Sequence, residues 1–130
     1  MPIKTSSAKA KGRKFQQSLR DRILAKFAGE LEEGDVVSTS MGAGGVDVQL
    51  SPLAKRVFPV SIEAKATRKH PAMAEMKQAQ ANIYKNTTAA VCWSPHGTGP
   101  QDSMITFNFD DFLDLVVELQ AGIYHKGEGK

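Results

Sequence analysis

The sequence predicts an α/β domain in which a mixed β-sheet is flanked by helices, in the order α-β-β-β-α-β-β-α. Three observations carry this expectation. Apolar residues recur about every four positions near the start and near the end of the chain, as in amphipathic helices. Short alternating or β-branched apolar runs lie between them, and Gly, Pro and Asn separate the segments. Helices placed before, between and after strands are typical of helices packed on a sheet.

The first helix is expected to begin at Gly12 and to end near Gly34. Its apolar stripe comprises Phe15, Leu19, Ile23, Leu24 and Phe27. Two strands follow at residues 35–40 and 46–50, and the second alternates between apolar and polar residues. A glycine-rich loop joins them.

A turn or short helical connection at 51–56 leads to the third strand, expected at 57–66, with Pro59 at its start or at a sheet edge. The second helix is expected at 70–86, where Pro71 suits the first turn.

The last part of the chain predicts strands at 87–94 and 104–109, separated by a loop rich in Pro and Gly. A closing helix at 110–122 is expected to have Asp110 as its N-cap.

Three parts are expected along the chain. Residues 1–11 form a disordered basic tail, residues 12–124 a single domain, and residues 125–130 a frayed end.

Composition restricts the class of protein. The 130 residues are 41% hydrophobic and 24% charged, as in a globular domain that can bury a core. No apolar run reaches the ~18–20 residues of a membrane-spanning helix, and no secretory signal is visible. Cys92 is the only cysteine, which favours a reducing setting. We therefore expect a protein of the cytoplasm that does not act at a membrane.

Basic residues cluster although the net charge is only +3. This uneven distribution predicts a polyanionic partner, bound through phosphate contacts from one face, although ordinary solvated lysines would give a similar pattern. The candidate contact residues are Lys9, Lys11, Arg13, Lys14, Lys55, Arg56, Arg68 and Lys69. Ser38 and Ser40, beside the glycine-rich loop, are candidate hydrogen-bond donors to phosphate.

The third strand carries two opposite charges within an apolar run. Glu63 and Lys65 are two residues apart, so both leave the strand on the same face, about 6–7 Å from each other. Asp47 stands between two valines in the preceding strand, in the same phase. If these strands are neighbours, two carboxylates and an ammonium group meet at one place.

Such a cluster fits a hard divalent cation. Mg²⁺ takes one or two carboxylates together with water and substrate phosphate oxygens. A bound cation supplies an activated water and stabilises charge on phosphorus, and a lysine can position the water or the phosphate. The alternative for each residue alone is structural, because Glu-x-Lys is often a solvated ion pair and an Asp beside glycines is often a turn residue. The combination favours the site.

The run from "GGVDVQL" to "VSIEAKA", with Asp47 and then Glu63-Ala64-Lys65, resembles the PD-(D/E)XK nuclease superfamily. Val46 stands where that family often has a proline. Gln80 and Tyr84 match its Q-x-x-x-Y element on the following helix. The wider sequence, over about residues 12–95, is similar to small phage-encoded proteins described as Holliday-junction resolvases, which are similar to archaeal-type resolvases.

The resemblance implies a restriction-endonuclease-like fold and an Mg²⁺- or Mn²⁺-dependent endonuclease that acts on four-way DNA junctions as a homodimer, in a bacterial host cell. Asp47 and Glu63 would be metal ligands, with the Ala64 carbonyl as a third. Lys65 would orient or activate water, Gln80 would support it, and Tyr84 would brace the helix.

One position departs from the pattern. Archaeal-type resolvases carry a metal-binding Glu in the first helix, four residues after a Gly, and here that position is Gln16. Gln16 could still coordinate through its oxygen, and Gln17 is an adjacent alternative. The change leaves two rival functions open. One is a repair, restriction or packaging nuclease of the same fold, and the other is a non-catalytic DNA-binding protein on a nuclease scaffold.

Overall fold

The computed structural model describes residues 5–39, 46–67, 69–71, 73–95 and 99–128, without the side chains of 5–8, 100 and 123–128. Its helices are α1 (Thr5–Lys26), α2 (Pro52–Val57), α3 (Met73–Ala81) and α4 (Phe109–Glu128), with 3₁₀ turns at Glu33–Asp35 and Pro100–Asp102. Its strands are β1 (Val36–Ser38), β2 (Val48–Leu50), β3 (Val60–Lys65), β4 (Thr88–Trp93) and β5 (Met104–Thr106). The α/β class and the predicted order of elements are confirmed, and the connection at 51–56 is the short helix α2.

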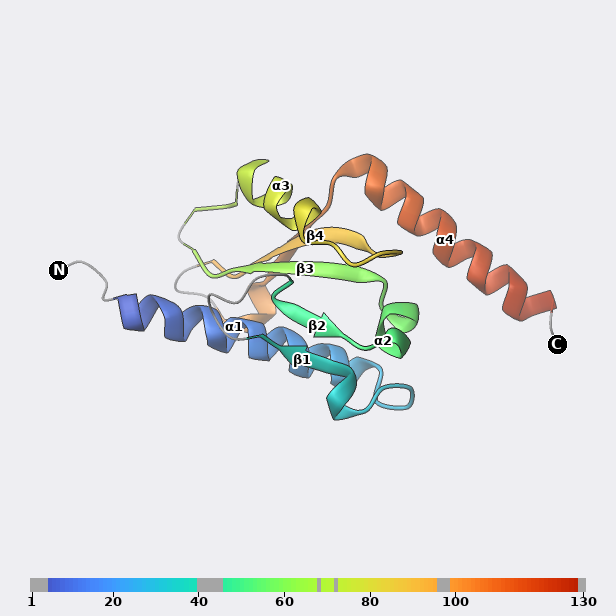
Figure 1. The fold of residues 1–130 in the computed structure, drawn as a ribbon, viewed down its shortest axis with the longest axis horizontal. Coiled ribbons are helices and arrows are strands. Elements are labelled where there is room, and N and C mark those ends of the chain that lie inside the picture. The colour runs from blue at the N-terminus through green and yellow to red at the C-terminus, as the bar shows by residue number, and fades with distance from the viewer. Residues whose placement is uncertain (1–4, 40–45, 68, 72, 96–98, 129–130) are drawn as a thin grey trace.

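The strands form a layer between α1 on one face and α3 on the other, while α4 extends away from the sheet (Figure 1). β3, β4 and β5 make a three-stranded sheet in which β3–β4 is parallel and β4–β5 antiparallel. β1 and β2 form a separate antiparallel hairpin. The predicted single mixed sheet is therefore divided in two.

Asp47 explains this division. Its N–H donates to the Ile62 carbonyl at 3.3 Å, as a strand neighbour would. Its side-chain Oδ2 then accepts the Ala64 N–H at 2.7 Å, where a regular ladder would use a backbone carbonyl. The hairpin is thus joined to β3 through one residue, and that residue is the predicted metal ligand.

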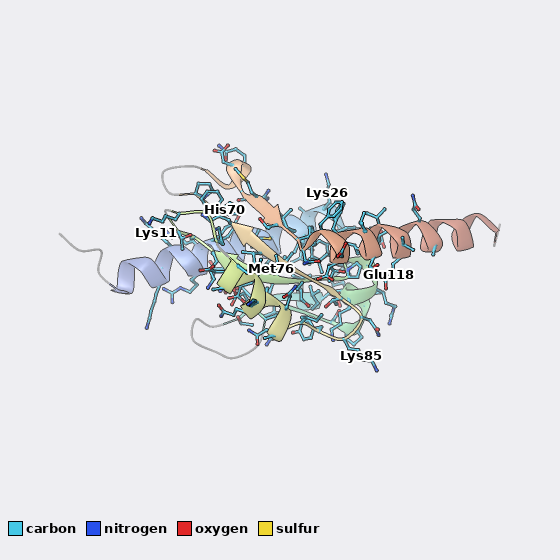
Figure 2. The ribbon with its side chains drawn as sticks, turned by 90° about the horizontal axis from the view of Figure 1, so that it is seen from above. Lys11, Lys26, His70, Met76, Lys85 and Glu118 are labelled. Carbon is cyan, nitrogen blue, oxygen red and sulfur yellow. The ribbon has the colours of Figure 1, made fainter. Side chains whose placement is uncertain are left out.

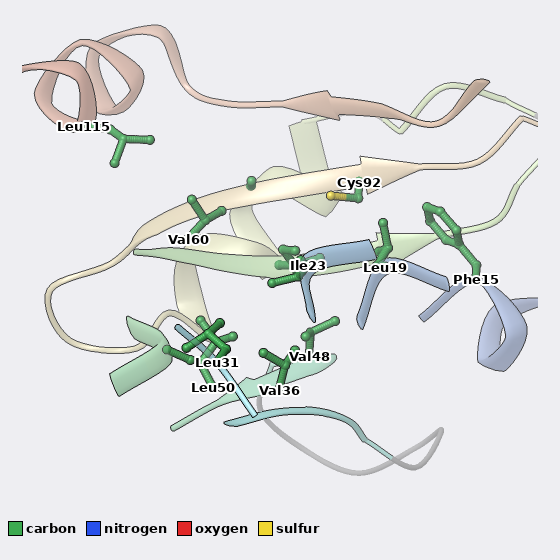
Figure 3. Close-up of a cluster of buried hydrophobic side chains, with 13 residues drawn as sticks. Phe15, Leu19, Ile23, Leu31, Val36, Val48, Leu50, Val60, Cys92 and Leu115 are labelled. Carbon is green, nitrogen blue, oxygen red and sulfur yellow. The ribbon is translucent and has the colours of Figure 1, made fainter. Parts of the chain in front are cut away.

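The main core lies between α1 and the inner faces of the strands. Phe15, Leu19 and Ile23 of α1 face Cys92 and Val60, with the hairpin valines below them (Figure 3). A second, smaller cluster covers the opposite face of the sheet. It consists of Met76, Ala79, Ala89 and Val91. Of β4, Ala90 and Cys92 belong to the main core, and Ala89 and Val91 to the second cluster, so alternate residues of that strand face different layers.

The ends of α1 differ from the prediction. α1 begins at Thr5, so residues 5–11 are helical and the expected disordered tail is wrong over that range. Their low hydrophobicity suggested disorder, but Ala and Lys are strong helix formers. α1 ends at Lys26, before Gly34, because the chain turns through Gly29 to bury Leu31.

The later helices also have other bounds than expected. α4 begins at Phe109, and Asn108 rather than Asp110 is its N-cap, since the Asn108 side chain accepts the Asp111 N–H. α4 continues to Glu128, so residues 125–128 are helical instead of frayed. α3 ends at Ala81, so Tyr84 lies in the turn after it.

Ser61 causes this early end of α3. Its Oγ accepts the Tyr84 N–H at 3.0 Å, which a continuing helix would have directed to a carbonyl four residues back. The Thr87 hydroxyl donates to the Tyr84 carbonyl at 2.6 Å, so the 2.5 Å contact between Ser61 and Thr87 has Ser61 as donor. Asn86, at φ 65°, completes the turn into β4 in a conformation that Asn tolerates.

This closed ring of hydrogen bonds gives a first prediction. Ser61 is buried, so Ser61→Ala leaves the Tyr84 N–H without an acceptor and should lower the free energy of unfolding by about 1–3 kcal/mol. Urea denaturation measures the change. Thr88→Val is the control, because the described contacts give that hydroxyl no hydrogen bond, and it should change stability by less than about 0.5 kcal/mol. Equal effects of the two substitutions would contradict the assigned role of Ser61.

Candidate functional site

Asp47, Glu63 and Lys65 lie together where β3 ends. Lys65 Nζ is 3.4 Å from Glu63 Oε1, as expected for residues that share one face of a strand. Asp47 reaches the same place from the hairpin through its hydrogen bond to the Ala64 N–H. Its charge acts on both other groups, because it raises the pKa of Glu63 and is itself stabilised by Lys65. The structure thus brings together the three residues that the sequence predicted.

The two carboxyl groups are poorly solvated. Glu63 is only 4% exposed, and burial raises its pKa, with a further increase from the negative charge of Asp47 and an opposing effect of Lys65. Burial also raises the pKa of Asp47, against the hydrogen bond from Ala64 and the charge of Lys65. The single lysine therefore does not compensate the buried Glu63 and the half-buried Asp47, and the cluster lacks positive charge.

This shortage predicts a pH-dependent cost in stability. Because the folded-state pKa of Glu63 is raised, the folded protein holds more protons, and the free energy of unfolding falls as pH rises through that pKa. Glu63→Gln should therefore raise the melting temperature at pH 8 in EDTA, by about 4 °C for each ~1 kcal/mol gained. The increase in melting temperature should become smaller toward pH 4. It should vanish at a pH where Glu63 is protonated in both the folded and the unfolded state.

Thermal unfolding from pH 4 to pH 8 measures this effect. Glu118→Gln, on the exposed surface of α4, removes the same charge and is the control. Adding Mg²⁺ at pH 8 should stabilise the wild type and leave Glu63→Gln unchanged. A Glu63→Gln protein that is less stable than the wild type at every pH would show that the carboxylate is a structural ion pair.

The donor set fits a hard divalent cation. A strand residue directs its N–H and C=O to the same edge, so the Ala64 carbonyl lies on the side of Asp47. Two carboxylates and this carbonyl would hold the cation, and water and phosphate oxygens would complete its coordination. Among the residues that the structure describes, no group of three or more His, Cys, Asp or Glu side chains is placed to hold a metal ion.

Gln16 is buried in α1, with 3% exposure. Its Oε1 accepts a hydrogen bond from Ser38 Oγ at 3.2 Å, and Ser38 pairs with Val48, the residue after Asp47. Gln16 is thus tied to the hairpin that carries Asp47, whereas Gln17 is exposed. Its role as a metal ligand stays a prediction.

Gln80 and Tyr84 occupy other places than the resemblance implied. Gln80 is exposed on α3 and its Nε2 lies 3.5 Å from Asp111 Oδ2 of α4. The hydrogen bond that the structure describes for Gln80 is therefore made to α4 and not to Lys65. Tyr84 follows α3 and packs against the main core, with Lys55 Nζ 4.2 Å from its ring centre. Tyr84 braces the turn between α3 and β4, where the helix was expected to continue.

Four basic residues in the first half of α1 are exposed, and this half of the helix lies at the same end of the molecule as the site. These residues are Lys9, Lys11, Arg13 and Lys14. Lys11 lies at the same end of the molecule as His70, which follows β3, while Lys85 and Glu118 lie toward the other end (Figures 1 and 2). A positively charged helix end and the carboxylate cluster therefore lie at the same end of the molecule (Figures 1 and 2).

These four side chains belong to two flanks of α1. Lys9 and Arg13 precede Gln16 by seven and three residues, so they share its flank, which Gln16 places against the hairpin. Lys11 precedes Arg22 by eleven residues, about three turns, and Arg22 bonds Ser103 near β5. We name these the hairpin flank (Lys9, Arg13) and the β5 flank (Lys11, Lys14).

Lys55 and Arg56 do not border the site. They lie in α2, before β3 begins, and the site is where β3 ends, about 16 Å further along the strand. There they line a pocket with Lys85, Asn86 and Glu118. Their nearness in sequence was misleading because an extended strand separates its two ends.

The remaining candidate phosphate contacts differ in exposure, and two of them lie outside the described residues. Lys69 is exposed after β3, and the Thr67 hydroxyl donates to its carbonyl. Ser38 is half-buried and its hydroxyl is used by Gln16. Ser40 and Arg68 lie outside the described residues, as does most of the glycine-rich loop.

The structure adds an aromatic pair that sequence reasoning assigned no function. Trp93 ends β4 opposite Lys65 in the parallel register, and its ring centre lies 4.8 Å from that of His70. The sequence predicted a strand that ends at Trp93, but it did not predict which strand pairs with it.

Two further observations concern the described part of the chain. Burial raises the pKa of Cys92 to about 12, so its thiol is no nucleophile at neutral pH. No helix within the described ranges is long and apolar enough to cross a membrane.

Comparisons with protein-family models, with curated proteins and with solved structures found no match for this chain.

Proposed function

We propose that this protein is a divalent-metal-dependent DNA endonuclease of the PD-(D/E)XK type that cleaves branched DNA, with the four-way junction as its substrate. The observation that carries the proposal is the meeting of Asp47, Glu63 and Lys65 at the end of β3. One buried and one half-buried carboxylate, both with raised pKa, beside a single lysine are costly in a purely structural role, and a bound cation would offset that cost.

In the proposed reaction, Asp47, Glu63 and the Ala64 carbonyl would hold Mg²⁺ or Mn²⁺. The cation would make a bound water acidic and stabilise negative charge on the phosphate. Lys65 is half-buried and its ammonium is held by Glu63, so it can orient the attacking water and donate to a phosphate oxygen. In-line attack would form a bond between the water oxygen and phosphorus while the bond from phosphorus to the leaving oxygen breaks. The proton of the water would pass to solvent, and the leaving oxygen would take a proton from a solvent water to become a hydroxyl.

Branched DNA as substrate is supported by the charge distribution. The exposed basic residues at the start of α1 and Lys69 lie at the same end of the molecule as the site (Figures 1 and 2) and can bind phosphates without reading bases. Recognition through backbone path suits a substrate that is defined by shape, such as a junction.

A homodimer would present two sites to two of the four strands of a junction. Its proposed interface is α4, where Phe109, Leu113 and Val117 form a stripe that is 70%, 45% and 64% exposed. Apolar side chains at helical spacing on one face are typical of a surface that another chain covers.

The test is cleavage of a synthetic four-way junction with Mg²⁺, compared with EDTA and with linear duplex, flap and single-stranded DNA. We expect metal-dependent cleavage of the junction, and a loss of at least about 10²-fold in Lys65→Ala. Lys26→Ala, at the end of α1, is the matched control and should cleave normally. Cleavage of flap or duplex in preference to the junction would favour the repair or restriction alternative.

The non-catalytic alternative has one specific observation in its favour. Gln16 is neutral and is held by Ser38, where a carboxylate would complete the metal site. Under that alternative the wild type binds the junction and cuts no DNA with Mg²⁺ or Mn²⁺, and Lys65→Ala changes neither property.

A further inference from the structure

Trp93 stands beside the candidate catalytic lysine on the same face of the sheet. In the parallel register Trp93 is opposite Lys65, and Val91 is opposite Glu63. Paired residues of neighbouring strands direct their side chains to the same face, about 4.8 Å apart. Ala89 and Val91 are covered by α3, whereas Trp93, the next residue of that row, is only half-buried. The indole therefore lies at the border of the site, next to Lys65.

The orientation of the indole is fixed by two contacts. Its Nε1–H donates to the Thr67 carbonyl at 3.0 Å, and His70 makes an edge contact with an interplanar angle of 71°. Nε1–H is the only hydrogen-bonding group of a tryptophan side chain. Since that donor is already used, the exposed part of the ring can bind a ligand only through its π surface.

The surroundings of this π surface indicate what it would bind. Lys65 and Lys69 supply positive charge on the neighbouring strand and turn, so a ligand that combines a phosphate with a flat ring fits both features. Stacking of a base on an aromatic side chain contributes about 1–3 kcal/mol and does not depend on which base it is. A base inside a duplex is already stacked on both sides, so only an unpaired base is available to Trp93.

We propose that Trp93 is a stacking platform for an unpaired base next to the scissile phosphate, and that it selects DNA in which such a base exists. Where Lys65 contacts the phosphate, the adjoining base would lie on the indole. This proposal rests on the proposed function for the identity of the scissile phosphate. It narrows the substrate class to DNA with a splayed nucleotide at the cleavage position.

The chain has one tryptophan, so its fluorescence reports on this site alone. The probes are a duplex with one unpaired thymine and the fully paired duplex of the same sequence, titrated into the wild type in EDTA to prevent cleavage. We expect the unpaired thymine to quench the tryptophan and the paired duplex to quench it little. Trp93→Leu should weaken binding of the unpaired probe by about 5–150-fold and leave binding of the paired duplex unchanged.

Trp93→Phe keeps a smaller ring and should recover part of the lost affinity, and circular dichroism on both variants confirms folding. Equal quenching by the two probes, no quenching, no binding of either probe, or an equal loss for both in Trp93→Leu would overturn the proposal. The outcome separates from that of the nuclease assay. Selective quenching without any Mg²⁺-dependent cleavage would refute the endonuclease and support the stacking site. Mg²⁺-dependent cleavage without selective quenching would support the endonuclease and refute the stacking site.

Discussion

Asp47→Asn abolishes Mg²⁺-dependent DNA cleavage, with an expected loss of at least about 10³-fold in rate, and leaves DNA binding intact. The loss follows because a metal-bound water and charge stabilisation at phosphorus are worth several kcal/mol, and each 1.36 kcal/mol is about tenfold in rate. Asn keeps the oxygen that accepts the Ala64 N–H, so the join between the hairpin and β3 is preserved. Only the charge of Asp47 is removed.

Single-turnover cleavage and junction binding in EDTA measure the two properties separately. Asp114→Asn, an exposed carboxylate of α4, is the matched control and should leave both unchanged. Because burial raises the pKa of Asp47, removal of its charge should also make the metal-free protein somewhat more stable at pH 8. Residual cleavage within about tenfold of the wild type would mean that Asp47 is not a metal ligand.

Replacing the two cations of the hairpin flank should weaken DNA binding by roughly 10–100-fold at 0.1 M salt and lower the salt slope by about 1.8. The variant is Lys9→Gln with Arg13→Gln. Both residues share the flank of Gln16, whose bond to Ser38 turns it toward the hairpin and Asp47. Phosphates of a substrate that enters the site would therefore pass along this flank.

Lys11→Gln with Lys14→Gln is the matched control, because it removes the same charge from the same helix on the β5 flank. We expect a decrease of less than about fivefold for this pair, since only long-range attraction is lost. Fluorescence anisotropy with a labelled junction at several salt concentrations gives both quantities. Equal losses of DNA affinity in the two double variants would show that α1 attracts DNA only through its overall positive charge. They would contradict a defined path for the DNA along the hairpin flank.

Much of the fold could be predicted because it follows from local patterns. The four-residue period of Phe15, Leu19 and Ile23 predicted α1, and the alternation of β3 placed Glu63 and Lys65 on one face. Asp47 was predicted because its strand has the same phase as β3 and was assumed to be its neighbour. The structure brings together the side chains that these patterns placed.

What could not be predicted depends on contacts between distant residues. The end of α3 is set by Ser61, which takes the Tyr84 N–H from 23 positions away. The neighbours of Trp93 depend on the parallel register of β3 and β4, which no local pattern reports. Lys55 and Arg56 were misplaced because closeness in sequence to β3 says nothing about which end of the strand they occupy.

The central claim is that Asp47 and Glu63 together bind one divalent cation. It is tested most directly by the anomalous scattering of Mn²⁺ in crystals of the wild type. We expect one peak within about 2.0–2.6 Å of a carboxylate oxygen from each residue, beside the Ala64 carbonyl, and its disappearance in Asp47→Asn. Mn²⁺ bound elsewhere on the protein, with none between these two carboxylates, would contradict it.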